Sequence, residues 1–207
     1  MKTSFGFHRF LFMALTAILL PGCLLKTATV PTRHFVLASI PSNESAPAAA
    51  GQVSVAIGFV KMPSYLLRDH LAVRTGANEI EYLENALWAE RLDQSFQRTL
   101  TVNLTQLLSS DGTRLTEFGR RQPAAKVFVT VQQFDVDTHG HGVLIAQWRI
   151  STPDSDAPLK SGDARMTRTG ASPRGDPYVI ATTLSSLTDD FSREMMQSIR
   201  DYVKFSR

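Results

Sequence analysis

Hydrophobic and polar residues follow two different spacings along the chain, and each spacing predicts a different element. Strict or near alternation, which is typical of strands, occurs over residues 53–60, 126–137 and 143–150. Between the last two, a Thr-His-Gly-His-Gly segment predicts the turn of a hairpin. Shorter alternating segments predict further strands at residues 33–39, 70–75, 79–83 and 163–169. The last of these is polar enough to lie at the edge of a sheet.

Helical spacing occurs twice. After Trp88, leucine and phenylalanine recur every three or four residues as far as Leu108, which predicts an amphipathic helix that ends near Asp111-Gly112. Asp176-Pro177 is a typical helix start, with Asp as N-cap and Pro at the first helical position. The apolar stripe that follows predicts a second helix and consists of Ile180, Leu184, Leu187, Phe191, Met195, Ile199 and Tyr202.

The order of these elements indicates the fold class. The strands cluster in hairpins and do not alternate one for one with helices. This order favours an α+β fold, because βαβ units would require alternation. We therefore expect a single domain with a largely antiparallel β-sheet packed on two amphipathic helices.

The first 22 residues have the pattern of an export signal. Lys2 and Arg9 precede a short apolar run, which ends in Leu-Pro-Gly immediately before Cys23. This segment resembles a bacterial lipobox, which implies cleavage before Cys23 and lipidation of that residue, palmitate included. The alternatives are an ordinary signal peptide and a buried structural cysteine. Residue 24 is Leu and not Asp, which by resemblance to lipoprotein sorting implies the outer membrane.

The chain is expected to have three parts. We expect a signal peptide over residues 1–22, a lipidated tether over 23–32 and a periplasmic domain over 33–207.

Composition argues against one class of partner. The chain has 22 basic and 19 acidic residues, and the leader holds two of the basic ones and no acid. The remaining domain is thus nearly neutral, which argues against a nucleic-acid partner. With one cysteine, no intrachain disulfide can form.

Candidate chemistry is sparse. His139 and His141 have the only metal-like spacing, but the surrounding glycines predict an exposed turn. Asp135 and Asp137 are interpreted as ordinary surface acids beside that turn. No nucleophile elbow, phosphate-binding loop, dinucleotide fingerprint or zinc-protease motif occurs in the sequence. We therefore expect no catalytic residues, no metal and no cofactor.

The turn from Pro63 to Arg68 is the most informative irregular segment. It interrupts regular structure and contains Tyr65, Leu66 and Arg68, so an exposed aromatic-plus-arginine patch would suit a protein interface. Trp88 is added to this predicted partner-binding set. The alternative is that the apolar side chains fold back onto the sheet and that Trp88 holds the start of the helix against the core.

Several of these segments together resemble the ABC-type transport auxiliary lipoproteins of the PqiC/YmbA family. The resemblance rests on the lipobox cysteine, Pro-x-Tyr-Leu-x-Arg at 63–68 and Trp-Ala-Glu-x-Leu at 88–92. Weaker matches are Phe-Val-Leu at 35–37, the strand at 53–60, Ala-Val-Arg at 72–74 and Asn-Leu at 103–104. Arg-Asp-His at 68–70 departs from the family, which commonly has Arg-Pro there.

The resemblance implies a non-catalytic lipoprotein at the periplasmic face of the outer membrane. Such a protein docks the periplasmic assembly of an MCE-domain protein in a lipid-transport system and supports membrane integrity. In some systems of this kind an ABC ATPase drives transport, but this chain has no ATPase motif. Alternatives are a lipid-anchored periplasmic hydrolase and an envelope-binding structural module. The transported lipid and the formation of a homo-oligomer stay open.

Overall fold

The computed structural model describes residues 30–41, 53–109, 113–116, 123–152, 154–155 and 157–205. The chain divides into two units, Met1–Pro31 and Thr32–Arg207. Cys23 and the predicted helix stop at Asp111-Gly112 lie outside the described residues. All the described helices and strands lie in the larger unit.

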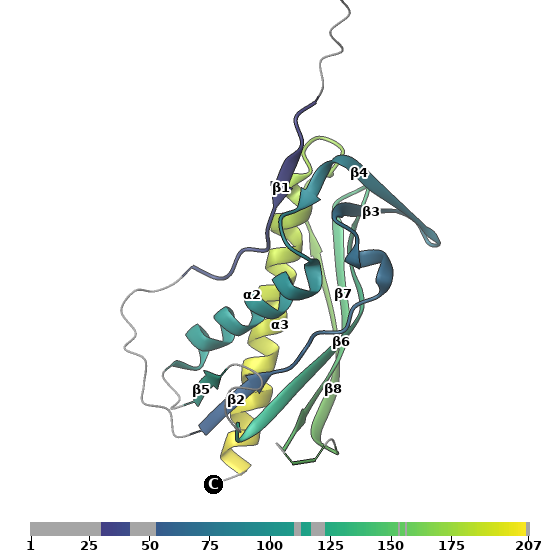
Figure 1. The fold of residues 1–207 in the computed structure, drawn as a ribbon. Coiled ribbons are helices and arrows are strands. Elements are labelled where there is room, and N and C mark those ends of the chain that lie inside the picture. Colours follow the sequence, from purple (N-terminus) through teal and green to yellow (C-terminus); the bar gives the residue numbers. More distant parts are fainter. Residues whose placement is uncertain are drawn as a thin grey trace, which may run out of the picture. The chain divides into compact units, whose positions relative to one another are not determined.

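Eight strands, two α-helices and one short 3-10 helix make up the described fold (Figure 1). The helical elements are η1 (Ser64–Leu67), α2 (Leu92–Leu107) and α3 (Tyr178–Phe205). The strands are β1 (Arg33–Phe35), β2 (Val53–Ile57), β3 (His70–Gly76), β4 (Glu79–Trp88), β5 (Thr113–Thr116), β6 (Ala125–Asp137), β7 (His141–Ser151) and β8 (Pro158–Thr169). The predicted α+β class, with two helices and one domain, is confirmed.

All eight strands join one mixed sheet. One path runs β1-β4-β3-β6-β2-β5, and β7 and β8 extend the sheet from the other side of β6. The long ladders β6–β7 and β7–β8 are antiparallel, as is β3–β4. The pairs β1–β4, β2–β5, β2–β6 and β3–β6 are parallel. Parallel pairs arise at β6 because β2 and β3 follow one another along the same side of this long strand.

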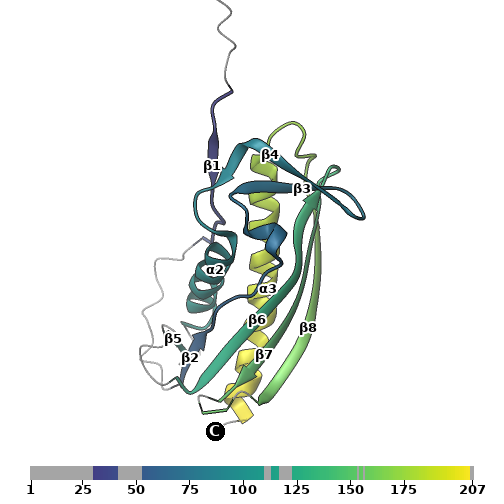
Figure 2. The same cartoon turned by 45° about the vertical axis from the view of Figure 1, so that its right-hand side comes forward.

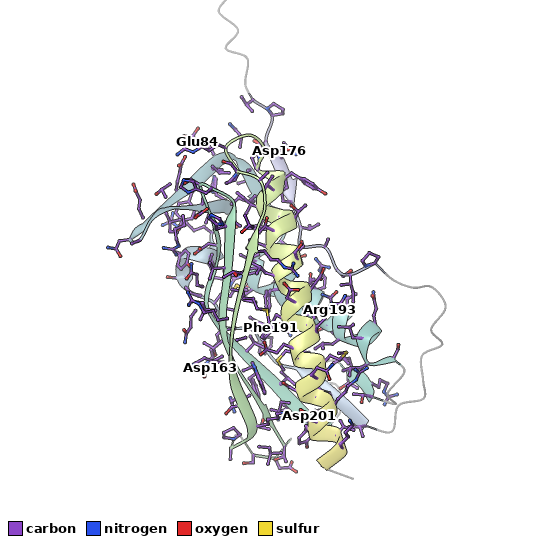
Figure 3. All side chains as sticks on the ribbon, turned by 180° about the vertical axis from the view of Figure 1, so that it is seen from behind. Glu84, Asp163, Asp176, Phe191, Arg193 and Asp201 are labelled. Carbon is purple, nitrogen blue, oxygen red and sulfur yellow. The ribbon has the colours of Figure 1, made fainter. Side chains whose placement is uncertain are left out.

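Both helices lie on the same side of the β6–β7–β8 ladder (Figures 1 and 2). Along β7, even-numbered residues from Leu144 to Ile150 are buried, which is the face that α3 covers. Three phenylalanines join the layers. The ring centroid of Phe96 from α2 lies 5.2 Å from that of Phe134 on β6 and 5.9 Å from that of Phe191 on α3. Figure 3 shows Phe191 between α3 and the sheet.

Element boundaries depart from the sequence prediction in a few places. β8 begins at Pro158, five residues before the expected start, and β4 continues to Trp88. The short strand β5 (Thr113–Thr116) follows α2, where the sequence pattern predicts no strand. The N-cap prediction for α3 is confirmed, because the Tyr178 N–H donates to Asp176 Oδ1 over 2.9 Å.

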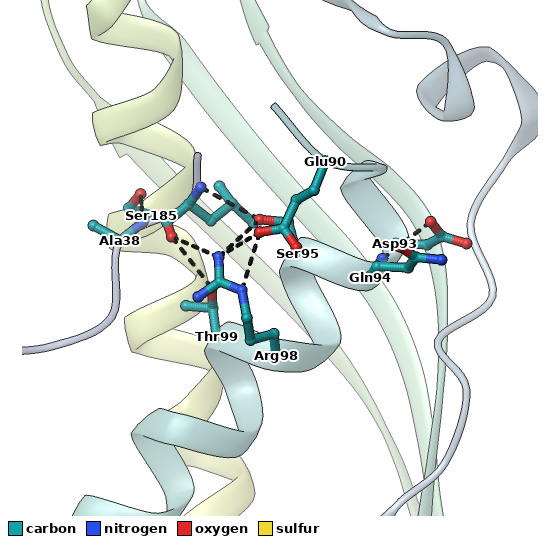
Figure 4. A network of polar contacts seen from close by, with 9 residues as sticks. Ala38, Glu90, Asp93, Gln94, Ser95, Arg98, Thr99 and Ser185 are labelled. Atoms are coloured by element: carbon teal, nitrogen blue, oxygen red, sulfur yellow. Dashed lines mark hydrogen bonds and ion pairs between the residues drawn. The ribbon is translucent and has the colours of Figure 1, made fainter. Parts of the chain in front are cut away.

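Residues 37–40 run as an extended segment alongside both helices, and side chains satisfy its backbone (Figure 4). The Ala38 N–H donates to Ser185 Oγ of α3 over 3.0 Å. The Ile40 N–H donates to Asn103 Oδ1 of α2 over 2.9 Å. The carbonyl oxygen of Leu37 accepts from the Thr99 hydroxyl and from Arg98 of α2. These bonds fix the start of the domain to both helices, as buried backbone groups require partners.

Candidate functional site

The candidate site is built around η1, which lies along β6 between β2 and β3. Lys61 pairs with Thr130 of β6 in an isolated parallel bridge, and Val73 of β3 pairs with Val136. The chain between these contacts leaves the ladder and forms the 3-10 turn, closed by a hydrogen bond from the Leu66 N–H to the Pro63 carbonyl. Pro63 suits the start of such a turn for two reasons. The ring fixes its φ, here −58°, and proline has no backbone N–H that would need a partner.

One side of η1 points into the core. Leu66 is 3% exposed and Trp88, at the end of β4, is 7% exposed, and both belong to the main hydrophobic cluster. They line a small internal pocket together with Phe134, Ile180 and Leu184. Leu66 and Trp88 therefore support the turn from below and offer little surface to a partner. Of the two interpretations of Trp88, the structure places it in the core.

The other side of η1 carries Tyr65 to a buried polar cluster on the outer face of the sheet. Asp135 is 2% exposed, so the interpretation of this residue as a surface acid was wrong. Its carboxylate accepts hydrogen bonds from the Tyr65 hydroxyl at 2.8 Å, from Arg74 Nε and Nη2 at 3.0 and 2.7 Å, and from Gln133 Nε2 at 2.9 Å. A buried carboxylate with a bidentate arginine and two further donors has its charge fully compensated.

The protonation states of this cluster suit a structural role. Burial raises the pKa of the Tyr65 hydroxyl, and the hydrogen bond to Asp135 raises it further. The same carboxylate raises the pKa of the Arg74 guanidinium by hydrogen bonding. Tyr65 is thus a permanent proton donor and Arg74 a permanent cation at neutral pH. A general acid or base needs a pKa near the working pH, so these two groups are not proton-transfer groups.

The accessible part of the turn consists of exposed Ser64, Arg68 and Asp69 with half-buried Pro63 and with Tyr82 of β4, and we call these five residues the η1 surface. The Arg68 guanidinium lies 5.0 Å from the ring centroid of Tyr82. The Tyr82 hydroxyl donates to the Tyr65 carbonyl over 3.0 Å. Stacking of an exposed arginine on a fixed aromatic ring orders its long side chain in advance, which lowers the entropic cost of binding.

The structure thus separates the predicted partner-binding set into three groups. Pro63 and Arg68 contribute to the η1 surface, Tyr65 is half-buried beneath it, and Leu66 and Trp88 are core residues. Sequence reasoning did not find Tyr82 and Asp135 as parts of this site. Nothing local marks Asp135, because the strand alternation places it on the outer face and its partners lie up to 70 residues away.

A second polar cluster lies between the helices. Asn103 Nδ2 donates to Asp189 Oδ1 at 2.9 Å and to Ser192 Oγ at 3.0 Å, while its Oδ1 holds Ile40. Burial raises the pKa of the Asp189 carboxyl, and the hydrogen bond from Asn103 opposes this in part. Every member of the cluster joins one segment of the chain to another, so the cluster is structural.

The histidine turn between β6 and β7 is also organised by its own side chains. Asp137 Oδ1 accepts the backbone N–H groups of His139 and His141 at 2.8 and 2.9 Å. His141 Nδ1 lies 3.1 Å from Thr169 Oγ1. Both imidazoles are exposed, and no group of three potential metal ligands occurs among the described residues.

The outer face of the sheet carries a shallow cavity of about 480 Å³ over β6, β7 and β8. Phe128, Thr130, Trp148 and Arg149 line it together with residues 161–163. The Arg149 guanidinium lies 4.2 Å from the Phe128 ring centroid, and Gln147 Nε2 donates to Asp163 Oδ1 at 3.0 Å. The lining contains both polar and apolar side chains, and the described residues that form it include no histidine or cysteine.

In the described part of the chain, no helix is both long and apolar enough to cross a membrane.

Comparison with known proteins identifies the family. A family model described as the ABC-type transport auxiliary lipoprotein component matches residues 35–196. The intermembrane transport lipoprotein PqiC of Escherichia coli is 24% identical over 139 residues, which are 67% of this chain and 72% of the relative. PqiC of Shigella flexneri matches to the same extent.

Two crystal structures share the fold. An uncharacterized protein has a TM-score of 0.68 at 18% identity and covers 82% of this chain and 99% of its own. A protein from Xanthomonas campestris has a TM-score of 0.64 at 14% identity and covers 85% of this chain and 100% of its own. The family model spans the fold from the end of β1 into α3, and the protein belongs to the ABC-type transport auxiliary lipoprotein family.

Proposed function

We propose that this protein is a non-catalytic outer-membrane lipoprotein that docks the periplasmic MCE-domain assembly of a lipid-transport system. The observation that carries the proposal is the family match over residues 35–196, which includes the end of β1, the η1 surface, α2, most of α3 and the rest of the sheet. The relatives in Escherichia coli and Shigella flexneri are named intermembrane transport lipoproteins, which supports a role between two membranes.

In this proposal the anchor and the docking surface are separate parts of the chain. Cys23 carries the lipid, and residues 24–32 connect it to β1. The η1 surface meets the partner, with Arg68 as its central contact. Support for this assignment comes from the exposed, ring-stacked position of Arg68 and from the rigid base that Tyr65, Arg74 and Asp135 give the turn. Such a preorganised aromatic-and-arginine patch is typical of binding hot spots.

A lipid-anchored hydrolase is the alternative of a different class. The polar clusters described above are occupied by internal hydrogen bonds, and the imidazoles of His139 and His141 contact the hydroxyls of Thr138 and Thr169. None of these contacts joins a serine hydroxyl to a histidine base, as an acyl-transfer site requires. These contacts therefore give the hydrolase no support over the docking role.

Affinity capture from envelope membranes tests the proposal. The full-length tagged chain, extracted in mild detergent, is expected to recover an MCE-domain protein, and deletion of the gene is expected to sensitise cells to detergent. The matched control is the Arg68→Ala chain at equal abundance, which should recover much less of that protein. Recovery of no MCE-domain protein by a folded, membrane-bound chain would refute the docking role.

A further inference from the structure

The cavity on the outer face of the sheet has the size of a ligand site. Its volume of about 480 Å³ lies within the range of about 300–1,000 Å³ that is typical of small-molecule sites. The cavity opens over β6, β7 and β8, and Figure 3 shows Asp163, one of its lining residues, on the sheet and away from α3. No residue of the η1 surface belongs to its lining.

Two rows of paired residues cross the strands at this cavity. In the first row, Phe128 of β6 lies opposite Arg149 of β7, and Arg149 lies opposite Ser161 of β8. The Arg149 guanidinium lies 4.2 Å from the Phe128 ring centroid. Stacking uses the flat face of a guanidinium, whereas its N–H donors lie in the plane and suit bidentate binding of phosphate. The first row therefore presents a cation of defined orientation.

The Phe128 ring is supported by close packing against Gly58, which follows β2. A Cβ atom at Gly58 would lie 2.8 Å from Phe128 Cδ1, which is closer than carbon atoms pack, so glycine suits this place beside the ring. The Gly58 N–H donates to the Val127 carbonyl over 2.8 Å, which fixes the backbone at this point. The ring and the guanidinium are thus ordered in advance, which lowers the entropic cost of binding.

The second row carries opposite charges at its two ends. Thr130 of β6 lies opposite Gln147 of β7, and Gln147 lies opposite Asp163 of β8. On the other side of Thr130, Lys61 continues the row through an isolated parallel bridge. Lys61 is exposed, and its ammonium forms no ion pair with another described residue. Gln147 Nε2 donates to Asp163 Oδ1, which leaves Gln147 Oε1 and Asp163 Oδ2 as further acceptors.

Together the two rows form a cationic region beside an anionic one. Arg149 and Lys61 lie on the strands to either side of the Thr130 hydroxyl, and the three donors suit a phosphate group. The Asp163 carboxylate and the Gln147 carbonyl oxygen suit an ammonium group. Neighbouring strands are about 4.8 Å apart, so about one strand spacing separates the two regions. Phosphate and ammonium groups that are joined by a two-carbon link span a similar distance.

We propose that this cavity binds a phosphoethanolamine group. Arg149, Lys61 and Thr130 hold the phosphate, and Asp163 and Gln147 hold the ammonium. Each charge of the ligand then meets the opposite charge on the protein. The group occurs in a phospholipid headgroup and in soluble esters, and both present the same chemistry to the cavity. The proposal is independent of the docking role, because none of these five residues belongs to the η1 surface.

The two charged regions make the site selective. Glycerol phosphate has no ammonium group, so its binding leaves Asp163 near an anion without a cation between them. Phosphocholine has a cation without N–H donors, so it cannot donate hydrogen bonds to Gln147 or Asp163. We expect phosphoethanolamine to bind about tenfold more tightly than either compound.

Isothermal titration calorimetry of the full-length protein in detergent measures these affinities. Arg149→Gln should weaken the binding of phosphoethanolamine on the order of tenfold or more, because a bidentate charged contact is lost. Lys61→Gln should weaken it about threefold, since an exposed ammonium contributes less. Arg114→Gln is the matched control. It removes an exposed cation from β5, at the far end of the strand path, and should leave the affinity unchanged.

Asp163→Asn distinguishes this site from a general anion site. The amide has the size of the carboxylate but no charge, so the variant should bind phosphoethanolamine less tightly and glycerol phosphate more tightly than wild type. Equal changes in both affinities would overturn the proposal. The same holds for a wild type that binds glycerol phosphate as tightly as phosphoethanolamine, or that does not bind phosphoethanolamine.

Mass spectrometry of lipids that co-purify with the full-length chain identifies the source of the group. A phospholipid source predicts phosphatidylethanolamine on wild type and its loss from Arg149→Gln. A soluble source predicts equal lipid on both chains while calorimetric binding to wild type persists, and either result supports the site. Arg149→Gln should still capture the MCE-domain protein, so failure of this site and failure of the docking role are distinguishable. Calorimetric binding that is unchanged in Arg149→Gln, with equal lipid on both chains, would show that the cavity is not the site.

Discussion

The Tyr65 hydroxyl donates a hydrogen bond to Asp135 Oδ2 over 2.8 Å and thereby joins a turn to a strand 70 residues further along the chain. Asp135 is held at the same time by two donors of Arg74 from β3, Nε and Nη2. The turn between β2 and β3 is thus fixed to the outer face of the sheet while Leu66 fixes it to the core. Arg68, two residues after Leu66, is presented on a rigid base.

Loss of the Asp135 carboxylate should therefore destabilise the domain strongly. Asp135→Ala leaves Arg74, whose side chain is 24% exposed, without its counter-ion, and should lower the free energy of unfolding by about 3–5 kcal/mol. Tyr65→Phe removes one donor to a charged acceptor and should lower it by about 1.5–3 kcal/mol. Denaturant unfolding followed by circular dichroism measures both changes.

Asp69→Ala is the matched control for these variants. It removes an exposed carboxylate from the same turn and should change the free energy of unfolding by less than about 0.5 kcal/mol. If Asp135→Ala were as mild as Asp69→Ala, the carboxylate would not hold the turn.

Local patterns along the chain are informative where one element has one buried face. Alternation over 126–137 and 143–150 predicts the β6–β7 hairpin because each strand has one buried face, and the ladder pairs Phe134 with Leu144 as this requires. The stripe that contains Phe191 predicts α3 for the same reason. In both cases the pattern and the buried face come from neighbouring residues of one element.

Features that depend on distant residues were not predictable in this way. β2 and β3 pair in parallel with one strand because η1 carries the chain along β6, and periodicity contains no information on that path. β8 begins five residues before the prediction, since Pro158 and Leu159 are exposed at an edge and give no alternation. The burial of Asp135 follows only from contacts with Tyr65 and Arg74, which the fold brings to it.

The pH dependence of stability should contain a contribution from Asp189. Burial raises the pKa of this carboxyl in the folded state, so its stabilising contribution is complete below the unfolded pKa and is lost as the pH rises through the folded pKa. Asp189→Asn can still accept the Asn103 hydrogen bond but has no charge. The gain in Tm of Asp189→Asn over wild type should therefore grow between about pH 4 and pH 7.

Differential scanning calorimetry of both proteins at several pH values measures this gain. The carboxyl groups of Glu90, Asp93 and Asp176 have lowered pKa values in the folded state, so their contribution to stability increases as the pH rises. Both proteins share these three groups, so their contributions cancel in the difference. The charge of Asp190 also raises the pKa of the Asp189 carboxyl, while the charges of Arg193 and Arg168 lower it. A gain that stays constant with pH would show that Asp189 does not titrate differently on unfolding.

Lipidation should depend on Cys23. Cleavage before this residue and acylation of its thiol and new amine would anchor the chain, and several acyl chains at about 0.8 kcal/mol per buried CH₂ make anchoring effectively permanent. Cys23→Ala is expected to accumulate as an uncleaved precursor without palmitate label. Cys23→Ser is a closely matched second variant, since it keeps the size of the side chain but not the thiol. Normal processing and labelling of either variant would refute lipidation at this position.

Binding and folding should depend on different residues of the predicted partner-binding set. Trp88 is 7% exposed and lines the pocket beneath η1, so Trp88→Ala should lower the free energy of unfolding by about 3–5 kcal/mol. Arg68 is exposed and stacks on Tyr82, so Arg68→Ala should cost about 0.5–1 kcal/mol of stability. Its effect on capture of the MCE-domain partner should be larger, about 2 kcal/mol or more of binding free energy.

Thermal unfolding and affinity capture on the same preparations test this separation. Arg68→Lys is the critical variant, because it keeps the charge but loses the planar group that stacks on Tyr82 and binds carboxylates in a bidentate manner. Capture by Arg68→Lys should fall nearly as far as by Arg68→Ala if stacking and planar recognition matter, and should stay near wild type if only the charge matters. Arg149→Ala, on the outer face away from η1, controls for the loss of any arginine. Full capture by both Arg68 variants, with folding intact, would place the partner interface elsewhere on the domain.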